Sequence, residues 1–252
     1  MDAVLNIAAY RFVAIVDVDA VIVRVGALAQ DNDLRGTVLV APEGINLFLA
    51  GSKAGIEGFL DALQRDTRFA DIEVKRSWSA HIPFAKLKVK RKKEIIAFAG
   101  RPAGVGTQRA PAVAAKELAR WLRAGHDDDG RKIILLDTRN REEIAYGTFS
   151  GAMTLPIDNF NDLPAAIDDV REHFTDATVV SFCTGGVRCE KAAPWLESAG
   201  VDRVFQLEGG ILRYFEEVGG EGYGGRCFVF DERIALDPAL RPLRDVATEA
   251  TA

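Results

Sequence analysis

Hydrophobic and polar positions in the first hundred residues alternate in short blocks that predict strands and helices in a mixed order. Runs rich in apolar and β-branched residues favour strands at 4–15, 36–41, 45–50 and 72–77. The stretches 17–29 and 52–65 have helical spacing, and Asp17 and Ser52 stand where a capping side chain is expected. The order strand-helix-strand-strand-helix-strand predicts a ferredoxin-like α+β domain over residues 1–100, with both helices on one face of its sheet.

The pattern changes after residue 132. Short, nearly continuous apolar runs at 133–136, 178–182 and 204–207 are typical of parallel strands that are buried on both faces. Helical stretches at 162–173 and 188–199 separate these runs, so residues 126–220 are predicted to form an α/β domain with a parallel sheet. Residues 101–125 are expected to be a linker followed by a helix. Residues 221–252 are expected to be a C-terminal tail. The glycine-rich run 219–225 predicts flexibility, a short strand is predicted at 227–230, and the last dozen residues are expected to be frayed.

Basic residues cluster between positions 75 and 93, although the chain as a whole carries a net charge of -5. That net charge argues against a uniformly basic nucleic-acid-binding protein, but a local patch can still attract phosphates. The alternation of charged and apolar residues within 86–98 predicts a further edge strand. Its lysines could contact RNA, or could equally keep a solvated edge from aggregating. The RNA-binding candidates are Lys75, Arg76, His81, Lys86, Lys88, Lys90, Arg91, Lys92 and Lys93; His81 is included because its ring could stack on a base.

Composition narrows the class of protein further. Of the 252 residues, 48% are apolar, which is ample for buried cores. The cysteines, Cys183, Cys189 and Cys227, are too few and too scattered for a disulfide framework, and they match no common zinc-ligand spacing. Free thiols fit a reducing cytoplasm. Because Asp17 and Asp19 interrupt the apolar N-terminal region, neither a signal peptide nor a membrane span is expected.

The most informative segment is the loop Cys183-Thr184-Gly185-Gly186-Val187-Arg188, which joins a predicted buried strand to a predicted helix. Backbone N–H groups and the positive end of the helix are expected to face the sulfur in such a loop. The glycines allow the backbone to bend, and Arg188 supplies a permanent positive charge. All of these features favour the thiolate, so we expect a depressed pKa and a nucleophilic Cys183 rather than a buried, inert thiol.

This loop resembles the active-site loop of rhodaneses, Cys-x4-Arg, and further blocks agree in the same order along the chain. Asp137-Thr138-Arg139 resembles the rhodanese Asp-x-Arg element. Residues 147–152 resemble the Gly-His-Ile-x-Gly-Ala stretch, with Thr148 in place of the usual His, and 207–211 resemble the terminal Leu-x-Gly-Gly turn. The cysteine phosphatases related to this fold have one more residue between Cys and Arg, so the resemblance disfavours a phosphatase.

Longer motifs resemble one family that contains a rhodanese domain, the bacterial tRNA uridine(34) hydroxylases (TrhO). They are Cys183-Thr-Gly-Gly-Val-Arg-Cys-Glu-Lys191, Gly36-Thr-Val-Leu-Val-Ala-Pro-Glu-Gly-Ile-Asn46 and Cys227-Phe-Val-Phe-Asp-Glu-Arg233. The resemblance covers about residues 1–237 and implies an acylphosphatase-like N-terminal domain followed by a rhodanese domain. It also implies that uridine at the wobble position of tRNA is converted to 5-hydroxyuridine with molecular oxygen as co-substrate.

Several roles follow for residues around Cys183. Cys183 and Arg188 are the expected catalytic residues, and the backbone of Thr184, Gly185, Gly186 and Val187 is the expected cradle. Asp137 and Arg139 either bond around this loop or form a structural ion pair. Cys189 either resolves an oxidised or persulfidated Cys183 or only fills space. No flavin or nicotinamide fingerprint and no facial triad of metal ligands is recognisable, so neither a metal nor a flavin is predicted and the electron donor is unassigned.

Two other functions remain open at this point. The loop alone would suit a sulfurtransferase that carries a persulfide on Cys183. The basic N-terminal region would suit a non-catalytic module that binds RNA or a protein. The expected partner on the main interpretation is the anticodon region of tRNA.

Overall fold

The computed structural model describes residues 3–103 and 109–245, and its contacts divide the chain into two compact units. The first unit comprises the chain up to Ile95, together with Phe230–Ile234 and the segment from Arg241 onward. The second unit comprises Ile96–Val229 and Ala235–Leu240. Part of the expected linker, residues 104–108, lies outside the described residues, as do residues 246–252 of the expected tail.

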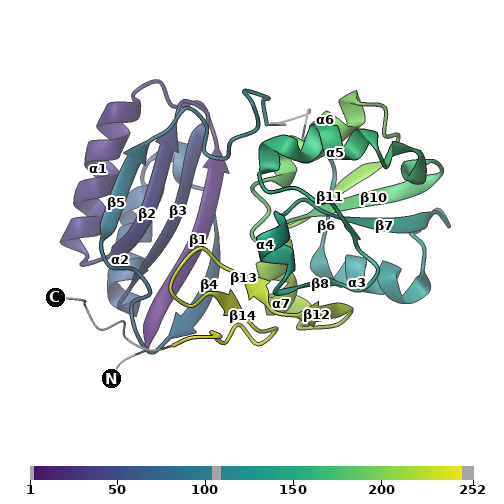
Figure 1. Cartoon of the computed structure of the whole chain (residues 1–252). Helices are drawn as coiled ribbons and strands as arrows, with labels where there is room; N and C mark the ends of the chain where they lie inside the picture. Colours follow the sequence, from purple (N-terminus) through teal and green to yellow (C-terminus); the bar gives the residue numbers. More distant parts are fainter. Residues whose placement is uncertain (1–2, 104–108, 246–252) are drawn as a thin grey trace. The chain divides into compact units, whose positions relative to one another are not determined.

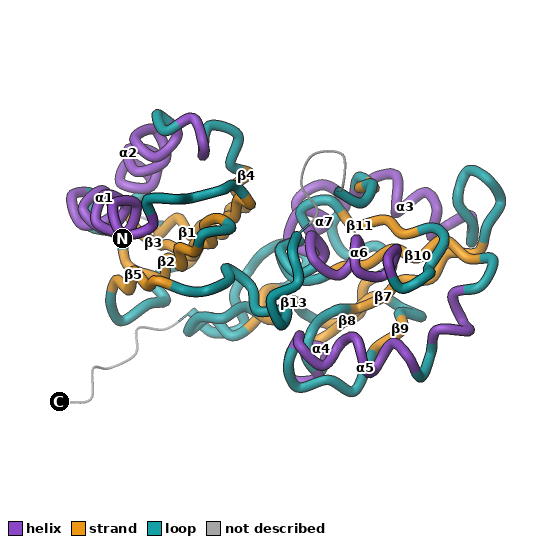
Figure 2. Tube along the Cα trace, turned by 90° about the horizontal axis from the view of Figure 1, so that it is seen from above, coloured by secondary structure: helices purple, strands orange, loops and turns teal. Residues whose placement is uncertain are grey.

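The first unit is a five-stranded sheet with two helices on one face (Figures 1 and 2). The elements are β1 (Val4–Phe12), α1 (Val18–Asp31), β2 (Arg35–Ala41), β3 (Gly44–Gly51), α2 (Lys53–Gln64), β4 (Glu73–Ser79) and β5 (Leu87–Arg91). The strand order is β4-β1-β3-β2-β5, in which β5 lies parallel to β2 and the other neighbours are antiparallel. The predicted ferredoxin-like fold is therefore confirmed, with β5 as the additional edge strand.

The alternation along β1 shows why the two faces of this sheet differ. Leu5, Ile7 and Ala9 belong to the hydrophobic core that the strands share with α1 and α2. The side chains between them point to the opposite face because successive residues of a strand alternate. The start of α2 is fixed as expected, since the Ser52 hydroxyl accepts a hydrogen bond from the backbone N–H of Gly55 at 3.0 Å.

The second unit is built on a parallel sheet in the order β6-β11-β10-β7-β9. Its strands are β6 (Ala112–Val113), β7 (Lys132–Asp137), β9 (Met153–Thr154), β10 (Ala177–Phe182) and β11 (Val204–Leu207). The helices are α3 (Ala115–Ala124), α4 (Arg141–Ile144), α5 (Leu163–Asp168), α6 (Cys189–Ser198) and α7 (Gly210–Val218). All six residues of the central strand β10 are buried, as the continuous apolar run predicted. The predicted α/β architecture is confirmed.

The helix predicted over 162–173 is wrong as a single element. The chain there forms α5 and then a separate 3₁₀ turn, Arg171–Phe174, after a break at Asp169 and Val170. Asp and Val have low helix propensity, and Asp competes for backbone hydrogen bonds, so the helix ends where these residues adjoin.

In the expected C-terminal tail, a short strand is present within the predicted range 227–230, but the glycine-rich run before it is not flexible, and the chain is held as far as Asp245. Strand β12 (Tyr223–Gly225) pairs with β8 (Gly147–Phe149), and β13 (Cys227–Phe228) pairs with β14 (Ala235–Leu236). The Arg233 guanidinium donates a hydrogen bond to the Ser77 hydroxyl at 2.7 Å, and the Asp245 carboxylate accepts one from the Ala80 backbone N–H at 2.8 Å. Hydrogen bonds to residues far away in the sequence order this segment despite its glycines.

Candidate active site

Cys183 lies at the carboxyl end of β10, and α6 begins six residues later at Cys189. The carboxyl edge of a parallel sheet is where loops of α/β proteins converge and where ligands bind most often. The side chain of Cys183 is 2% exposed, so the sulfur lies within the loop and not above it. A Cβ atom at Gly185 would meet nothing within 4 Å, which shows that the loop borders open space at this position.

The start of α7 holds the loop in its inward-facing conformation. The backbone N–H groups of Ile211 and Leu212 donate to the carbonyls of Cys183 and Thr184, each at 3.0 Å. A helix start has unpaired N–H groups, so these carbonyls are natural partners for it. Gly210 permits this approach: it has a φ of 66°, and a Cβ on it would lie 2.5 Å from the Cys183 carbonyl oxygen. The Leu-Glu-Gly-Gly segment thus turns the loop carbonyls away from the sulfur.

With the carbonyls facing away, the loop presents N–H groups to the sulfur. The backbone N–H of Gly186 donates to Cys183 Sγ at 3.1 Å. Gly186 has a φ of 96°, a conformation that favours glycine. Burial raises the pKa of Cys183, but a hydrogen bond from Cys189, the charge of Arg188 and the backbone N–H groups of Arg188 and Gly186 outweigh it and lower this pKa to about 6. Cys183 is therefore mainly a thiolate at neutral pH.

Arg188 is held by Glu143, a residue that the sequence did not single out. The Glu143 carboxylate accepts hydrogen bonds from Arg188 Nη2 at 2.7 Å and from Nη1 at 3.2 Å. The side chains are only 8% and 2% exposed. Glu143 is oriented at the start of α4, where its side chain accepts from the backbone N–H of Asn140 in a capping box. The Asn-x-x-Glu spacing is the one signal in the sequence that could have pointed to this carboxylate.

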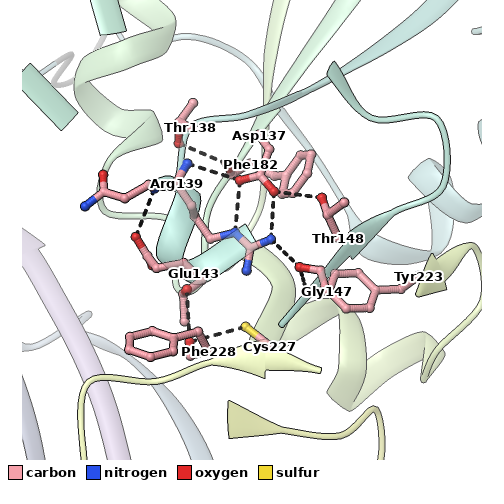
Figure 3. A network of polar contacts seen from close by, with 12 residues as sticks. Asp137, Thr138, Arg139, Glu143, Gly147, Thr148, Phe182, Tyr223, Cys227 and Phe228 are labelled. Carbon is pink, nitrogen blue, oxygen red and sulfur yellow. Dashed lines mark hydrogen bonds and ion pairs between the residues drawn. The ribbon is translucent and has the colours of Figure 1, made fainter. Parts of the chain in front are cut away.

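Asp137 and Arg139 form a buried network beside the loop (Figure 3). Arg139 donates to the Asp137 carboxylate at 2.9 and 2.7 Å, and both side chains are fully buried. The Thr148 hydroxyl donates to Asp137 at 2.7 Å, while the Gly147 carbonyl accepts from Arg139 and from the Tyr223 hydroxyl, each at 2.8 Å. This geometry is that of a buried ion pair that joins the strands β7, β8 and β12.

The remaining cysteines have the opposite electrostatics. Cys189 is fully buried, and burial together with the negative charge of Cys183 raises its pKa well above the ordinary value. Its sulfur contacts the Thr138 hydroxyl at 3.9 Å. Burial also raises the pKa of Cys227 to about 12, although nearby Arg139 acts in the other direction. Of the three thiols, Cys183 is the one with a lowered pKa, and the two neighbours stay protonated at neutral pH.

The basic candidates lie in the first unit. Lys86, Lys88, Lys90, Lys92 and Lys93 are exposed on and beside β5, and Arg76 is exposed on β4. Arg91 forms an ion pair with Asp19 at 2.6 Å. His81 is partly buried.

Lys75 is a correction to the expected RNA-binding set. Its side chain is 4% exposed, and its ammonium group lies 4.7 Å from the centroid of the Tyr10 ring. Strand alternation explains the error, because Lys75 points to the opposite face of β4 from Arg76. Lys75 is a buried cation held over an aromatic ring and is not available to phosphates in this conformation.

The part of the chain that the structure describes offers neither a metal-binding cluster nor a membrane-spanning helix. Within residues 3–103 and 109–245, no three His, Cys, Asp or Glu side chains are grouped so as to hold a metal ion. No helix in the same residues is both long and apolar enough to cross a membrane.

Comparison with known proteins identifies relatives of both halves and of the whole chain. Residues 4–95 match the UPF0176 acylphosphatase like domain, and residues 115–217 match the rhodanese-like domain. A tRNA uridine(34) hydroxylase of Xanthomonas euvesicatoria pv. vesicatoria is 60% identical over 242 residues, covering 96% of this chain and 98% of that protein. One of Xylella fastidiosa is 55% identical over 248 residues, covering 98% of this chain and 96% of that protein. The solved rhodanese-like domain from Anabaena sp. is 23% identical, with a TM-score of 0.37, and the match covers 46% of this chain and 79% of that one.

Proposed function

We propose a reaction for the Cys183 loop from one premise, that this chain belongs to the tRNA uridine(34) hydroxylase family. The reaction is the hydroxylation of uridine 34 of tRNA at C5 of the uracil ring, which gives 5-hydroxyuridine. Dioxygen is the co-substrate. One oxygen atom enters the base, and the other leaves as water with two electrons from a two-electron reductant and two protons. The enzyme is thus an oxidoreductase that modifies tRNA on a rhodanese scaffold, and a tRNA substrate implies work in the cytoplasm.

The observation that carries this proposal is the thiolate at Cys183. A pKa of about 6 leaves a charged sulfur at neutral pH, where an ordinary thiol would be protonated. Uracil is electron-poor at C6, so a thiolate can add there and move an electron pair toward C5, the carbon that is hydroxylated. That electron pair attacks one oxygen of a hydroperoxide, which the two-electron reductant forms from dioxygen; the O–O bond breaks, and the second oxygen leaves as hydroxide. Loss of the C5 proton, which converts this hydroxide to water, then restores the double bond and expels the thiolate. The Gly186 N–H and Arg188 stabilise the sulfur anion both before addition and after its release.

Arg188 and Glu143 act as a pair in this scheme. Glu143 holds the Arg188 guanidinium in place through two hydrogen bonds. The positive charge of Arg188 therefore acts on Cys183 while the guanidinium is bonded to Glu143. Arg188 is therefore proposed to stabilise the thiolate, and Glu143 to position Arg188. Cys189 is proposed to contribute its hydrogen bond to Cys183, which is among the causes of the lowered pKa.

The N-terminal unit is proposed to contact the anticodon region of the tRNA. Its exposed cations supply the charge that attracts phosphates. The residues proposed for this role are Arg76, Lys86, Lys88, Lys90, Arg91, Lys92 and Lys93, and the partly buried His81 is proposed to stack on a base.

The test uses a bacterial strain in which the gene has been deleted, complemented with the wild type or with Cys183→Ser. Mass spectrometry of tRNA nucleosides should detect 5-hydroxyuridine with the wild type and none with Cys183→Ser. Cys227→Ser is the matched control, because that thiol is also buried but has a raised pKa; it should retain the modification. Full modification by Cys183→Ser would refute a covalent role for the sulfur.

The same variants also distinguish the proposed hydroxylation from the alternative function, sulfur transfer. The rhodanese loop favours that alternative because a ring of N–H groups can also hold a persulfide. A sulfurtransferase would form thiocyanate from thiosulfate and cyanide, and Cys183 would gain the mass of one sulfur atom. Thiocyanate formation without any 5-hydroxyuridine in the complemented strain would replace the proposed reaction with sulfur transfer.

A further inference from the structure

We propose that one face of the N-terminal sheet binds an unpaired segment of the RNA substrate, with a base on the Phe48 ring and phosphates on the lysines of β5. This face, called the open face here, is the side of the sheet β4-β1-β3-β2-β5 that lies opposite α1 and α2 (Figure 2). The proposal deepens the proposed tRNA activity and rests on it. It assigns the RNA to a particular surface, where the sequence offered only a cluster of basic residues.

Strand alternation sorts the basic residues of β5 between two faces. Leu87 and Val89 pack against the core that the sheet shares with α1 and α2. Lys86, Lys88 and Lys90 therefore point to the open face. All three are exposed, and none of them has a carboxylate within ion-pair distance among the residues that the structure describes. They form a row of uncompensated positive charge along one edge.

Aromatic side chains lie further in on the same face. In the strand register, Lys88 pairs with Thr37 of β2, Thr37 pairs with Phe48 of β3, and Phe48 pairs with Ala8 of β1. These four positions share one face because paired residues in a sheet point the same way. Tyr10 and Phe12 continue the face along β1, with their ring centroids 6.0 Å apart, but the Lys75 ammonium group lies over the Tyr10 ring. Phe48, Tyr10 and Phe12 are each partly exposed.

Parts of the open face are covered by the chain itself, which limits where RNA can lie. The Asn46 side chain donates to the Ile95 carbonyl at 3.3 Å, and Arg233 donates to Ser77 at 2.7 Å. Asn46 and Ser77 are buried as a result. The accessible portion is centred on β2 and β5 and reaches Phe48, and Arg35 at the start of β2 adds another exposed cation to it.

The dimensions and chemistry of this portion fit single-stranded RNA. Neighbouring strands are about 4.8 Å apart, so Phe48 lies roughly 10 Å from the lysine row, within the reach of one nucleotide whose phosphate contacts a lysine. A ring on a sheet can stack only on a base that is not already stacked in a helix. Unpaired lysines in a row complement a polyanion, whereas a protein partner of mixed charge would not need them. The loop of a tRNA hairpin supplies such unpaired bases.

The test measures binding of the full-length protein to a fluorescein-labelled RNA hairpin that contains the anticodon loop, by fluorescence anisotropy. Phe48→Leu removes the ring but keeps an apolar side chain, and it should weaken binding about 5- to 150-fold, the range for one stacked base. Phe48→Trp keeps a stacking surface and should bind within about threefold of the wild type. Circular dichroism and thermal unfolding of Phe48→Leu check that the fold is intact.

A second variant tests the phosphate contacts. Lys88→Gln should weaken binding and reduce the slope of log affinity against log salt concentration by about 0.7, the value for one phosphate contact on a single strand. Lys53→Gln is the matched control, because Lys53 is an exposed lysine on α2, on the opposite side of the sheet; its affinity and salt slope should equal those of the wild type. A fully paired RNA duplex should compete poorly for the site.

The outcomes distinguish this proposal from the proposed reaction. If the wild type modifies tRNA in cells but Phe48→Leu and Lys88→Gln bind the hairpin as the wild type does, the open face is not the RNA site. If the duplex competes as well as the unlabelled hairpin does, the claim that the open face prefers unpaired RNA is refuted. If the wild type binds the hairpin through Phe48 but makes no 5-hydroxyuridine, the proposed reaction is refuted while the proposed RNA-binding surface is supported. Cys183→Ser should bind the hairpin normally.

Discussion

Replacing Arg188 with Gln should raise the pKa of Cys183 so that at least about half of this sulfur is protonated at neutral pH. In the wild type the pKa of Cys183 falls from 9.0 to about 6, even though burial acts in the opposite direction. A difference of three units corresponds to about 4 kcal/mol in favour of the thiolate. At pH 7 this leaves about nine-tenths of the sulfur charged.

The expected rise in the pKa of Cys183 follows from the loss of the buried positive charge of Arg188. Removing an opposite charge next to an acid raises its pKa by about 1–3 units, which gives a value of about 7–9 in Arg188→Gln. The charged fraction at pH 7 would then fall to between about one-half and one-hundredth. Glu143 adds to the effect, since Arg188→Gln leaves its carboxylate buried without a cation. The double variant Arg188→Gln/Glu143→Gln removes that negative charge as well. The pKa of Cys183 should therefore rise less in the double variant than in Arg188→Gln.

The assay is the rate of alkylation by iodoacetamide as a function of pH, because only the thiolate reacts. Cys183→Ser provides the background from Cys189 and Cys227. The wild type should show a midpoint near 6, the single variant the highest midpoint, and the double variant a value between them. A midpoint that stays near 6 in Arg188→Gln would refute the claim that this guanidinium stabilises the sulfur. A double variant that exceeds the single one would refute the contribution of Glu143.

Three further predictions concern stability. Because the pKa of Cys183 is lowered in the folded protein, the thiolate's contribution to stability is fully present above pH 9 and is lost as the pH falls to 6. Urea unfolding should show the wild type losing about 1.4 kcal/mol of unfolding free energy per pH unit across that window relative to Cys183→Ser. Parallel curves of the two proteins would contradict the lowered pKa. Gly210→Ala should destabilise the fold by about 2–4 kcal/mol and slow alkylation of Cys183. Gly125→Ala, with a similar positive φ but open space around it, should cost about 1 kcal/mol by the same unfolding assay and leave alkylation unchanged; equal losses would show that the contact with the loop is unimportant. Asp137→Asn should cost about 3–5 kcal/mol because it leaves Arg139 buried without its counter-ion, and a loss below 1 kcal/mol in urea would mean that the network relaxes.

The sequence by itself determined the features that local chemistry controls. The period of apolar residues separated the α+β half from the parallel α/β half, and Ser52 marked the start of a helix. The thiol-bearing loop was also recognisable, because glycines, a following helix and an arginine near a cysteine all act on that sulfur from within six positions. Even the additional edge strand followed from alternation, since a strand exposes every second side chain wherever it is placed.

Tertiary structure alone decided the pairings between distant residues. Glu143 reaches Arg188 across 45 positions because α4 packs near the loop, and no local pattern contains that contact. Lys75 lies buried over Tyr10 because β4 turns that face toward covering segments, while a count of basic residues treats all lysines alike. The C-terminal segment is ordered by hydrogen bonds to Ser77 and Ala80, which outweigh the freedom of its glycines. The neighbours of a charged side chain are set only when distant segments pack together. The sequence therefore identified the ionisable residues of the site but not the residues with which they pair.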